Sequence, residues 1–593
     1  MKELEYPFDS EWLLRKKRSL KKELLFENKS RLVKRIAILG GSTTSNIKEM
    51  LELFLLNYDI EATFYESEYN KFFEDAMFEN KKLEEFSPDI IYIHTTNRNI
   101  MKYPNLSMDK SNVESILNQE YEKFEKIWNR LAKVYKCPII QNNFELPYYR
   151  LLGNIEASDY RGKVNYITKL NMKFYDYASE HEKFYIQDIN YLSATYGIER
   201  WNNNFYWYMY KYALDVSAMP FLAFNLANMI KSIYGKNKKG MVLDLDNTLW
   251  GGVIGDDGQE NIQIGHEISA GQAFYDFQYY IKEYKQLGII LNVNSKNEYE
   301  NAILGLEHPD GLLKPEDFIV IKSNWNPKSK NLVEIADELN LGVDSLVFID
   351  DNPAERAIIN QQIPSVATPI IDVPENYINI IDKSAFFEVT SISMDDLRKN
   401  EMYKENVERN KLLSSFDDYG AYLESLEMKA VIRPFESVYM ARIAQLTNKS
   451  NQFNLTTKRY TQSEIETVAE DENYITLYGK LEDVFGDNGV VSVIIGNKKD
   501  DVLHIDLWIM SCRVLKRDME YAMMDTLISY ANKAGIKEII GYYYPTVKNG
   551  MVKDFYAIQS FEKIEEDQDG NTKWRFMVDK NNVNKNNYIK VEM

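Results

Sequence analysis

Short apolar runs alternate with amphipathic stretches along the first third of the chain. Residues 35–39 (RIAIL) and 89–93 (DIIYI) have the length of buried strands. Between them, Ile47, Met50 and Phe54 recur at the spacing of one face of a helix. A chain that alternates strands and helices in this way predicts an α/β sheet.

The alternation resumes after a polar, lysine-rich break at residues 234–240. Three apolar runs, at 241–243, 289–293 and 346–349, predict the strands of a second α/β sheet with amphipathic helices between them. Further strands, together with a helix at 519–534, predict a third α/β unit. The charged stretch before this third unit predicts a helical connector.

These patterns predict three α/β domains in one chain, and a prior of roughly 150 residues per domain agrees with that number. The predicted segments are a charged helical leader (1–33), a first domain (34–235), a second domain (236–390), a helical connector (391–427), a third domain (428–580) and a polar, frayed tail (581–593).

Composition and charge narrow the class of protein. The chain has 593 residues, is 45% hydrophobic, carries a net charge of −19 and holds two cysteines. It has no run of 18 apolar residues and opens with charged residues, so we expect neither a membrane span nor a secretion signal. We expect a cytoplasmic protein that does not bind nucleic acid, because an acidic chain repels phosphate on average.

Two basic clusters contrast with this acidic background. One lies at residues 15–22 of the leader, and the other lies at 236–239. We interpret them as a solvated helix face and a basic linker; the alternative is a docking patch for an acidic partner.

Two aspartates follow the first apolar run of the second domain. Asp244 and Asp246 leave the predicted strand two residues apart, at the sheet edge where α/β proteins bind ligands. One carboxylate can attack phosphorus while the other handles the proton of the leaving group, and both can help to hold Mg²⁺.

The next strands end in complementary side chains. Ser295 ends the second run, and its hydroxyl can donate a hydrogen bond to a phosphoryl oxygen. Lys328 or Lys330 precedes the third run and can neutralise a phosphoryl group. Asp350 and Asp351 end that run with oxygen ligands for Mg²⁺. Together these residues predict a phosphoryl-transfer site.

The strings DLDNTLWGG, SKN, NPKSKN and FIDDNPAER occur in this order, and they resemble the four motifs of the haloacid dehalogenase (HAD) superfamily. Residues 243–356 closely resemble the FkbH-like proteins of HAD subfamily IIIC. This resemblance implies that Asp244 is the nucleophile, Asp246 the general acid/base and Lys328 the motif lysine, with Lys330 as the alternative. The interval between the first two motifs has no room for a large cap domain.

The resemblance also implies two sets of binding residues. The implied metal ligands are Asp244, Asp246 (also through its backbone oxygen), Asp350 and Asp351. The implied phosphate-binding residues are Thr248, Ser295, Lys296 and Asn297.

The third domain carries the strings LTNKSNQFNLTTKRYT and WIMSCRVLKRDME, which also match the FkbH-like pattern. The second string resembles the N-acetyltransferase (GNAT) fold, where a loop before a helix cradles the pyrophosphate of CoA. Lys516 and Asp518 replace the glycines of that loop, which disfavours CoA. We expect the phosphopantetheine arm of an acyl carrier protein instead, with contacts from Arg513, Lys516 and Arg517; the alternative is that these three only solvate a loop.

Cys512 lies beside Arg513, where a cation favours the thiolate. We hypothesise that Cys512 takes an acyl group and passes it to the carrier thiol; the alternative is a buried cysteine acting as a small hydrophobe. Cys137 is interpreted as a structural residue.

The first domain resembles the SGNH hydrolases in its Gly40-Gly41-Ser42 block. A serine hydrolase needs a histidine base. The matching position after Asp188 holds a tyrosine, and Asn97 alone is a weak match to a further family block. We therefore expect an SGNH-like, flavodoxin-type module without catalysis. The second domain should be a Rossmann-like HAD sheet, and the third a mixed GNAT-like sheet.

The resemblance implies one reaction. FkbH-like proteins dephosphorylate 1,3-bisphosphoglycerate with Mg²⁺ and load its glyceryl group onto an acyl carrier protein, in polyketide, secondary-metabolite or surface-polysaccharide biosynthesis. Three alternatives remain open: a plain phosphatase for a small phosphorylated metabolite with a relic GNAT-like domain, a GNAT-type N-acetyltransferase, and a non-enzymatic scaffold.

Overall fold

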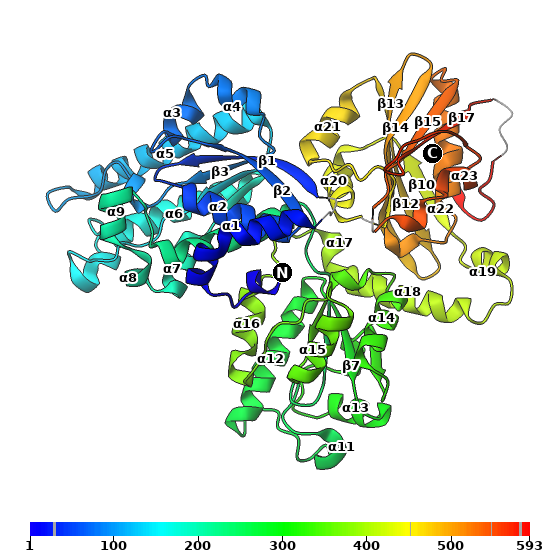
Figure 1. Cartoon of the computed structure of the whole chain (residues 1–593), viewed down its shortest axis with the longest axis horizontal. Helices are drawn as coiled ribbons and strands as arrows, with labels where there is room; N and C mark the ends of the chain where they lie inside the picture. The colour runs from blue at the N-terminus through cyan, green and yellow to red at the C-terminus, as the bar shows by residue number, and fades with distance from the viewer. Residues whose placement is uncertain (28–30, 451, 547, 580–583, 593) are drawn as a thin grey trace. The chain divides into compact units, whose positions relative to one another are not determined.

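The protein divides into two compact units, residues 1–233 and residues 234–593 (Figure 1). This computed structural model describes residues 1–27, 31–450, 452–546, 548–579 and 584–592.

The first unit is built on a five-stranded parallel sheet with the strand order β2-β1-β3-β4-β5. This order is that of flavodoxin-type folds, so the predicted sheet is confirmed. The strands are β1 (Leu32–Gly40), β2 (Ile60–Glu66), β3 (Ile90–His94), β4 (Ile139–Asn142) and β5 (Phe184–Gln187).

Helices pack against this sheet, which is why the central strand β3 is buried along its whole length. Ile91 and Ile93 of β3 pack with α5 (Lys110–Tyr135) and α6 (Lys163–Glu180) in one core. The other helices of the unit are α1 (Ser10–Phe26), α2 (Ser45–Asn57), α3 (Phe72–Met77), α4 (Lys81–Phe86), α7 (Ile189–Tyr196), α8 (Ile198–Trp201), α9 (Asn204–Tyr210) and α10 (Met219–Ile233).

The charged leader contains α1, which folds onto the first unit through three buried leucines. Two lysines of its basic face form ion pairs with glutamates of α2. Lys21 Nζ lies 2.8 Å from Glu52 Oε1 of α2, and Lys17 pairs with Glu49 of the same helix. Part of the leader's basic cluster therefore forms ion pairs inside its own unit.

The second unit begins with a four-stranded parallel sheet in the order β8-β7-β6-β9. Three of its strands were predicted, and β8 was not, although it overlaps the apolar run at residues 318–321 (FIVI). The strands are β6 (Gly240–Leu243), β7 (Ile290–Ser295), β8 (Val320–Ser323) and β9 (Leu346–Ile349). Residues 244–289, all of them described, hold only α11 (Ile254–Asp257) and α12 (Ser269–Gln286), without a cap domain.

Further helices surround this sheet and lead to the third. They are α13 (Tyr299–Leu306), α14 (Lys328–Glu338), α15 (Pro353–Gln362), α16 (Tyr377–Lys383), α17 (Met394–Leu397), α18 (Lys399–Leu413) and α19 (Tyr419–Ser425). The last three form the predicted helical connector.

The third sheet is mixed, as predicted for a GNAT-like fold, and follows the order β16-β17-β15-β14-β13-β12-β10-β18, with β11 beside β14. Its parallel neighbours β14 and β15 pair only along Val502–His504 before they diverge. The elements are β10 (Lys429–Arg433), α20 (Met440–Lys449), β11 (Phe453–Asn454), α21 (Gln462–Glu470), β12 (Tyr474–Asp483), β13 (Gly486–Lys499), β14 (Val502–Met510), α22 (Met519–Lys533), β15 (Glu538–Tyr543), α23 (Phe555–Ile558), β16 (Glu562–Glu566), β17 (Thr572–Met577) and β18 (Lys590–Glu592).

Part of the C-terminal tail, predicted to be frayed, forms a strand. Residues 581–583 and 593 lie outside the described part, but 590–592 are β18 rather than a frayed end. β18 pairs in parallel with β10, with Val591 opposite Ala430. The buried side chain of Ile589 joins the core just before the strand, so an edge strand and one apolar anchor order this polar segment.

None of the helices in the described part of the chain combines the length and the apolar character that a membrane span requires.

Candidate active site

Three carboxylates meet where β6 and β9 end. The two strands are neighbours, with Leu243 opposite Ile349, so the residues that follow them leave the same edge of the sheet. Oxygen atoms of Asp244, Asp350 and Asp351 all lie within 4.8 Å of one another. These are three of the four predicted metal ligands, and carboxylate oxygens suit a hard divalent cation.

Lys328 is the cation of this cluster. It begins α14, and its Nζ lies 2.8 Å from Asp244 Oδ2 and 2.7 Å from Asp350 Oδ2. Its side chain is 3% exposed, whereas that of Lys330 is 61% exposed and faces Glu334. Burial alone would lower the pKa of Lys328, but the charges of Asp244 and Asp350 outweigh burial and raise it. The structure therefore places Lys328, and not Lys330, beside the predicted nucleophile.

One ammonium group does not neutralise three carboxylates. Burial and the charge of Asp244 raise the pKa of Asp350 to about 6, although Lys328 is in contact with it. The same two causes raise the pKa of Asp351. Oδ1 of Asp244 is buried and has no hydrogen-bond partner among the described residues. An orphaned oxygen beside unneutralised carboxylates fits a divalent cation held by Asp244, Asp350 and Asp351.

The side chain of Asp246 points to the flap that follows β6 rather than to the three carboxylates. Its Oδ1 accepts hydrogen bonds from Trp250 Nε1 (2.9 Å) and from the backbone N–H of Ile254 (3.0 Å). Its Oδ2 accepts from Asn297 Nδ2 at 2.8 Å, and the same nitrogen lies 3.2 Å from Ser295 Oγ. The predicted acid/base and two predicted phosphate-binding residues thus form one network at the ends of β6 and β7.

The other two predicted phosphate-binding residues are placed differently. Thr248 Oγ1 lies 3.3 Å from Asp351 Oδ1 and accepts from the backbone N–H of Asp351 at 3.3 Å, so it joins the carboxylate cluster. Lys296 Nζ lies 2.6 Å from Glu355 Oε1 on α15. The ammonium of Lys296 is therefore already paired, and its predicted role requires that this ion pair open.

Two side chains that sequence reasoning missed brace the cluster. Arg356 Nη1 donates to the backbone carbonyls of Asp350 and Asp351, at 2.6 Å in both cases. The Tyr377 hydroxyl donates to the carbonyl of Asn247 at 2.9 Å, where the backbone has φ +54°. Arg356 ends the string FIDDNPAER, which was the available signal, whereas no local pattern points to Tyr377.

Two of the three predicted carrier contacts in the third domain, Arg513 and Arg517, are buried. Arg517 Nη1 lies 3.0 Å from Asp483 Oδ2, and its Nη2 donates to Asn406 Oδ1 of α18 at 2.7 Å. Arg513 is buried as well, and its Nη2 donates to the carbonyl of Asn488. Neither guanidinium group is presented to a partner, and neither solvates a surface loop.

The backbone of this loop still has the shape that glycines would allow. Lys516 has φ +64° and Asp518 has φ +59°, both in the left-handed region. Lys516 is exposed, and its carbonyl accepts a hydrogen bond from the Tyr419 hydroxyl of the connector. Of the three predicted contact residues, only Lys516 lies at the surface.

The two cysteines lie in apolar surroundings. Cys512 is half-buried at the edge of an apolar core that includes Leu346, Phe348 and Tyr403. Burial is the main cause that raises the pKa of Tyr403 far above its usual value, and the nearby Cys512 raises it further. Burial also raises the pKa of the Cys137 thiol to about 12. The acyl-carrying role of Cys512, its alternative as a small hydrophobe, and the structural role of Cys137 all stay predictions.

The serine of the first unit has no base. Ser42 is buried, and its hydroxyl has no hydrogen-bond partner among the described residues. The ring of His94 is engaged through Nδ1 by the side chains of Tyr92 and Asn142. Asp188, at the start of the expected histidine block, caps α7 by accepting from Tyr191 N. A first domain without catalysis stays a prediction.

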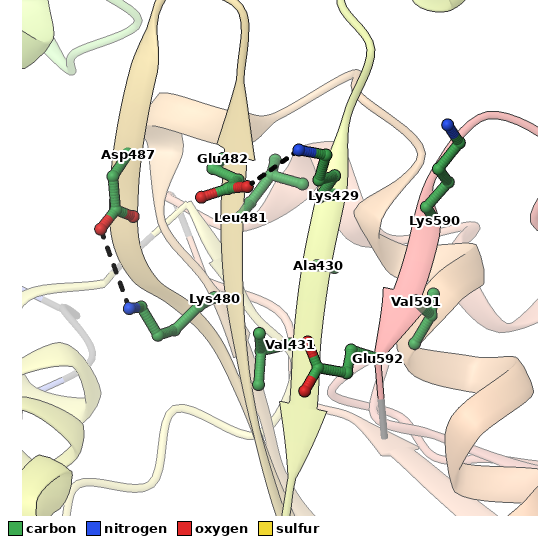
Figure 2. A pocket seen from close by; sticks show the side chains of 10 residues that line it. All are labelled: Lys429, Ala430, Val431, Lys480, Leu481, Glu482, Asp487, Lys590, Val591 and Glu592. Carbon is green, nitrogen blue, oxygen red and sulfur yellow. Dashed lines mark ion pairs between the residues drawn. The ribbon is translucent and has the colours of Figure 1, made fainter.

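A hollow of about 360 Å³ lies over β10, β12 and β18 of the third sheet, and none of the predicted site residues lines it (Figure 2). Its charged side chains pair across the sheet, with Lys429 Nζ 3.6 Å from Glu482 Oε1 and Lys480 Nζ 3.8 Å from Asp487 Oδ2. Paired surface charges of this kind offer neither a nucleophile nor a metal site, so the hollow does not compete with the carboxylate cluster.

The family model described as "FkbH, N-terminal domain" matches residues 35–231. The predicted resemblance to FkbH-like proteins is thereby confirmed for residues 35–231, which carry the flavodoxin-type sheet. No curated protein matches the chain.

Solved structures extend the likeness beyond the FkbH domain. The N-terminal part of the protein BF1531 from Bacteroides fragilis, which contains a phosphatase domain complexed with Mg, is 28% identical. This match has a TM-score of 0.58 and covers 64% of this chain and 99% of that chain. It confirms a HAD-type domain after the FkbH domain.

Acetyltransferases match a smaller part of the chain. The ribosomal-protein-S18-alanine N-acetyltransferase from Escherichia coli is 11% identical (26% of this chain, 99% of that chain, TM-score 0.21). Ard1 from Thermoplasma volcanium is 18% identical (25% and 97%, TM-score 0.20). Scores this low support nothing further, and the GNAT-like fold rests on the strand order of the third sheet.

Proposed function

We propose that the ends of β6, β7 and β9 form a Mg²⁺-dependent phosphoryl-transfer site with Asp244 as the nucleophile. One observation carries this proposal. Lys328 joins Asp244 to Asp350 while Asp351 completes the cluster, and the buried Oδ1 of Asp244 has no partner in the described part. The Mg complex of the Bacteroides fragilis phosphatase domain supports the choice of metal.

The residues divide the work as follows. Asp244 attacks the phosphorus of a phosphomonoester, the P–O bond to the substrate breaks, and the departing oxygen takes a proton from Asp246. A water molecule then gives a proton to Asp246 and attacks the phosphorus of the aspartyl phosphate, which releases inorganic phosphate and restores the Asp244 carboxylate. Lys328 stabilises charge on the transferring group, and Ser295 donates to one of its oxygens. A bound Mg²⁺ would add positive charge at the same oxygens.

The proposed substrate is 1,3-bisphosphoglycerate, and the proposed acceptor is the phosphopantetheine thiol of an acyl carrier protein. The HAD site removes the phosphate on C3. The acyl phosphate on C1 supplies the activated carbonyl: the thiolate attacks that carbon, and the second phosphate leaves. Support comes from the similarity of residues 35–231 to the FkbH N-terminal domain and from the absence of a cap domain within residues 244–289, which leaves more room for a protein-tethered acceptor than a capped site would.

The test combines two readouts. Protein, Mg²⁺, 1,3-bisphosphoglycerate and a phosphopantetheinylated carrier are incubated, inorganic phosphate is measured, and the carrier is weighed. We expect a glyceryl mass shift, and we expect Asp244→Asn to abolish release of the C3 phosphate. The matched control is Asp256→Asn, since Asp256 is an exposed carboxylate of the neighbouring flap.

The alternatives give different outcomes. Phosphate release without a mass shift would establish a plain phosphatase. Acetylation of an amine by acetyl-CoA would establish a GNAT-type enzyme. Full C3-phosphate release by Asp244→Asn would refute the assigned nucleophile.

A further inference from the structure

An exposed aromatic surface on the first unit has no role in the chemistry above. Helix α9 has the sequence NFYWYMY and no buried residue. Phe205 is 62% exposed, Tyr208 69% and Met209 61%. Single exposed apolar residues are common, but adjoining large ones mark interaction sites.

A second segment continues this surface. Tyr148, in the loop after β4, accepts a hydrogen bond from Asn204 Nδ2 of α9 at 2.8 Å, and the ring of Tyr149 packs against it at 5.1 Å. Leu151, three residues further along, is also exposed. We call α9 together with residues 146–155 the aromatic surface.

The aromatic surface is held in place by its own unit. Asn203 caps α9 by accepting from Phe205 N and Tyr206 N. Thr43, after β1, binds the end of the helix: its N–H donates to the carbonyl of Lys211 at 3.1 Å and its hydroxyl to that of Tyr210 at 2.8 Å. A short helix fixed at both ends presents its side chains without further ordering, which lowers the entropic cost of binding.

Cations lie on the rings of this surface. The guanidinium of Arg98 is 4.4 Å from the centre of the Trp207 ring, and Lys211 Nζ is 5.3 Å from the same ring. Lys163 Nζ is 5.0 Å from the centre of Tyr149. Within residues 146–155 and α9, Arg150 is the one charged residue, and Glu199 and Asp215 lie just outside α9. The aromatic surface therefore combines apolar area with positive charge from Arg150 and from the cations on its rings.

The rest of the chain has the opposite charge. Residues 1–233 hold 32 basic and 32 acidic residues, whereas residues 234–593 hold 39 basic and 58 acidic residues. The entire net charge of −19 thus belongs to the second unit. An acidic partner would be repelled by that unit on average and would meet no such repulsion at the first.

We propose that the aromatic surface docks the acidic carrier protein whose thiol receives the acyl group. This inference rests on the proposed function for the identity of the partner. It also supplies what the third sheet does not, because Arg513 and Arg517, the expected carrier contacts, are buried in internal hydrogen bonds. Aromatic residues, Met and Arg are the residue types enriched at protein interfaces.

The test uses two double variants and a matched control in the full chain. Tyr208→Ala/Met209→Ala removes apolar area, and Arg150→Glu/Lys211→Glu reverses charge. The control, Phe78→Ala/Lys82→Glu, changes an aromatic that is 63% exposed and an exposed lysine of the same unit. All these side chains are at the surface, so folding should be retained.

The readout that does not depend on catalysis is binding of a fluorescently labelled, phosphopantetheinylated acyl carrier protein, followed by anisotropy. We expect both surface variants to weaken binding about tenfold or more and the control to change it less than twofold. Added salt should weaken the wild type more than the charge-reversed variant. The rate of C3-phosphate release should stay unchanged in every variant.

Three outcomes would overturn the proposal: no carrier binding by the wild type, equal binding by the wild type and both surface variants, or loss of self-association in the variants without loss of carrier binding. The last would identify a second copy of this chain as the occupant. If the wild type binds the carrier but no acyl group is transferred, the proposed function fails while the docking surface stands.

Discussion

Replacing Lys328 by Met should reveal how strongly the carboxylate cluster depends on its only ammonium. Met preserves most of the length and apolar stem of lysine while removing the charge. Lys328 Nζ lies 2.8 Å from Asp244 Oδ2 and 2.7 Å from Asp350 Oδ2, with its side chain almost fully buried. Removing one partner of a buried charge network costs about 3–5 kcal/mol, because the remaining charges stay desolvated and unpaired.

The penalty should depend on pH with a definite sign. Asp350 has a raised pKa in the folded protein, to about 6. A raised carboxyl pKa contributes stability that is fully present below the unfolded pKa, about 4, and is lost as pH rises through the folded value. Without Lys328 the folded pKa of Asp350 should rise further. The loss of stability in Lys328→Met should therefore be larger at pH 8 than at pH 5.

Hydrogen exchange of the β6 and β9 amides measures this effect locally, which suits a chain with several domains. Lys330→Met is the matched control: Lys330 is exposed and its Nζ is 3.8 Å from Glu334 Oε1, so we expect a change within about 0.5 kcal/mol. The reasoning is refuted if Lys328→Met protects these amides as well as wild type does, or if its deficit is the same at pH 5 and pH 8.

Two further predictions concern Arg356 and Glu520. Arg356→Met removes the guanidinium that holds the carbonyls of Asp350 and Asp351, so the Mg²⁺ concentration for half-maximal phosphate release should rise about 10–100-fold; a metal titration that superimposes on the wild type would contradict this. Glu520 is half-buried and its pKa is raised to about 7, so the fold loses stability as pH rises from the unfolded pKa of about 4 to that value. Glu520→Gln should flatten the fall in melting temperature between pH 5 and pH 8, and an unchanged slope would exclude this role.

The strand ends of the candidate site could be predicted because each follows a short apolar run. Asp244, Ser295 and Asp350 all lie at one edge of the second sheet, as the pattern indicated. The choice between Lys328 and Lys330 could not be made from sequence alone. Both belong to the first turn of α14, two residues apart, so they point to different faces of the helix. Only the position of β9 decides which of them meets the carboxylates.

The third sheet shows where local pattern is insufficient. Arg513 and Arg517 belong to a basic loop, and a basic loop predicts surface contacts. Their partners come from distant parts of the chain: Asp483 ends β12 and Asn406 lies on α18 of the connector. No local periodicity indicates such pairs, because they depend on how the connector packs against the sheet.

Charge balance separates the two buried clusters of the second unit. In one, Arg409 and Arg517 face Asp483 and Glu405, and the buried Arg513 lies beside them, so the anions do not exceed the cations in number. Arg409 forms two bonds to Asp483, at 2.9 and 2.7 Å. A hydrogen-bonded network of this kind needs no ligand and holds the connector to the third sheet.

The cluster at the ends of β6 and β9 has the opposite character. Three carboxylates share one lysine, two of their pKa values are raised, and one carboxylate oxygen is left without a partner in the described part. Such a deficit destabilises the fold unless a cation relieves it. Saturating Mg²⁺ should consequently stabilise the HAD-type domain, because the carboxylate cluster has negative charge for the ion to neutralise. The hydrogen exchange of the α18 amides should stay unchanged, because the network of Arg409 and Asp483 has no such excess.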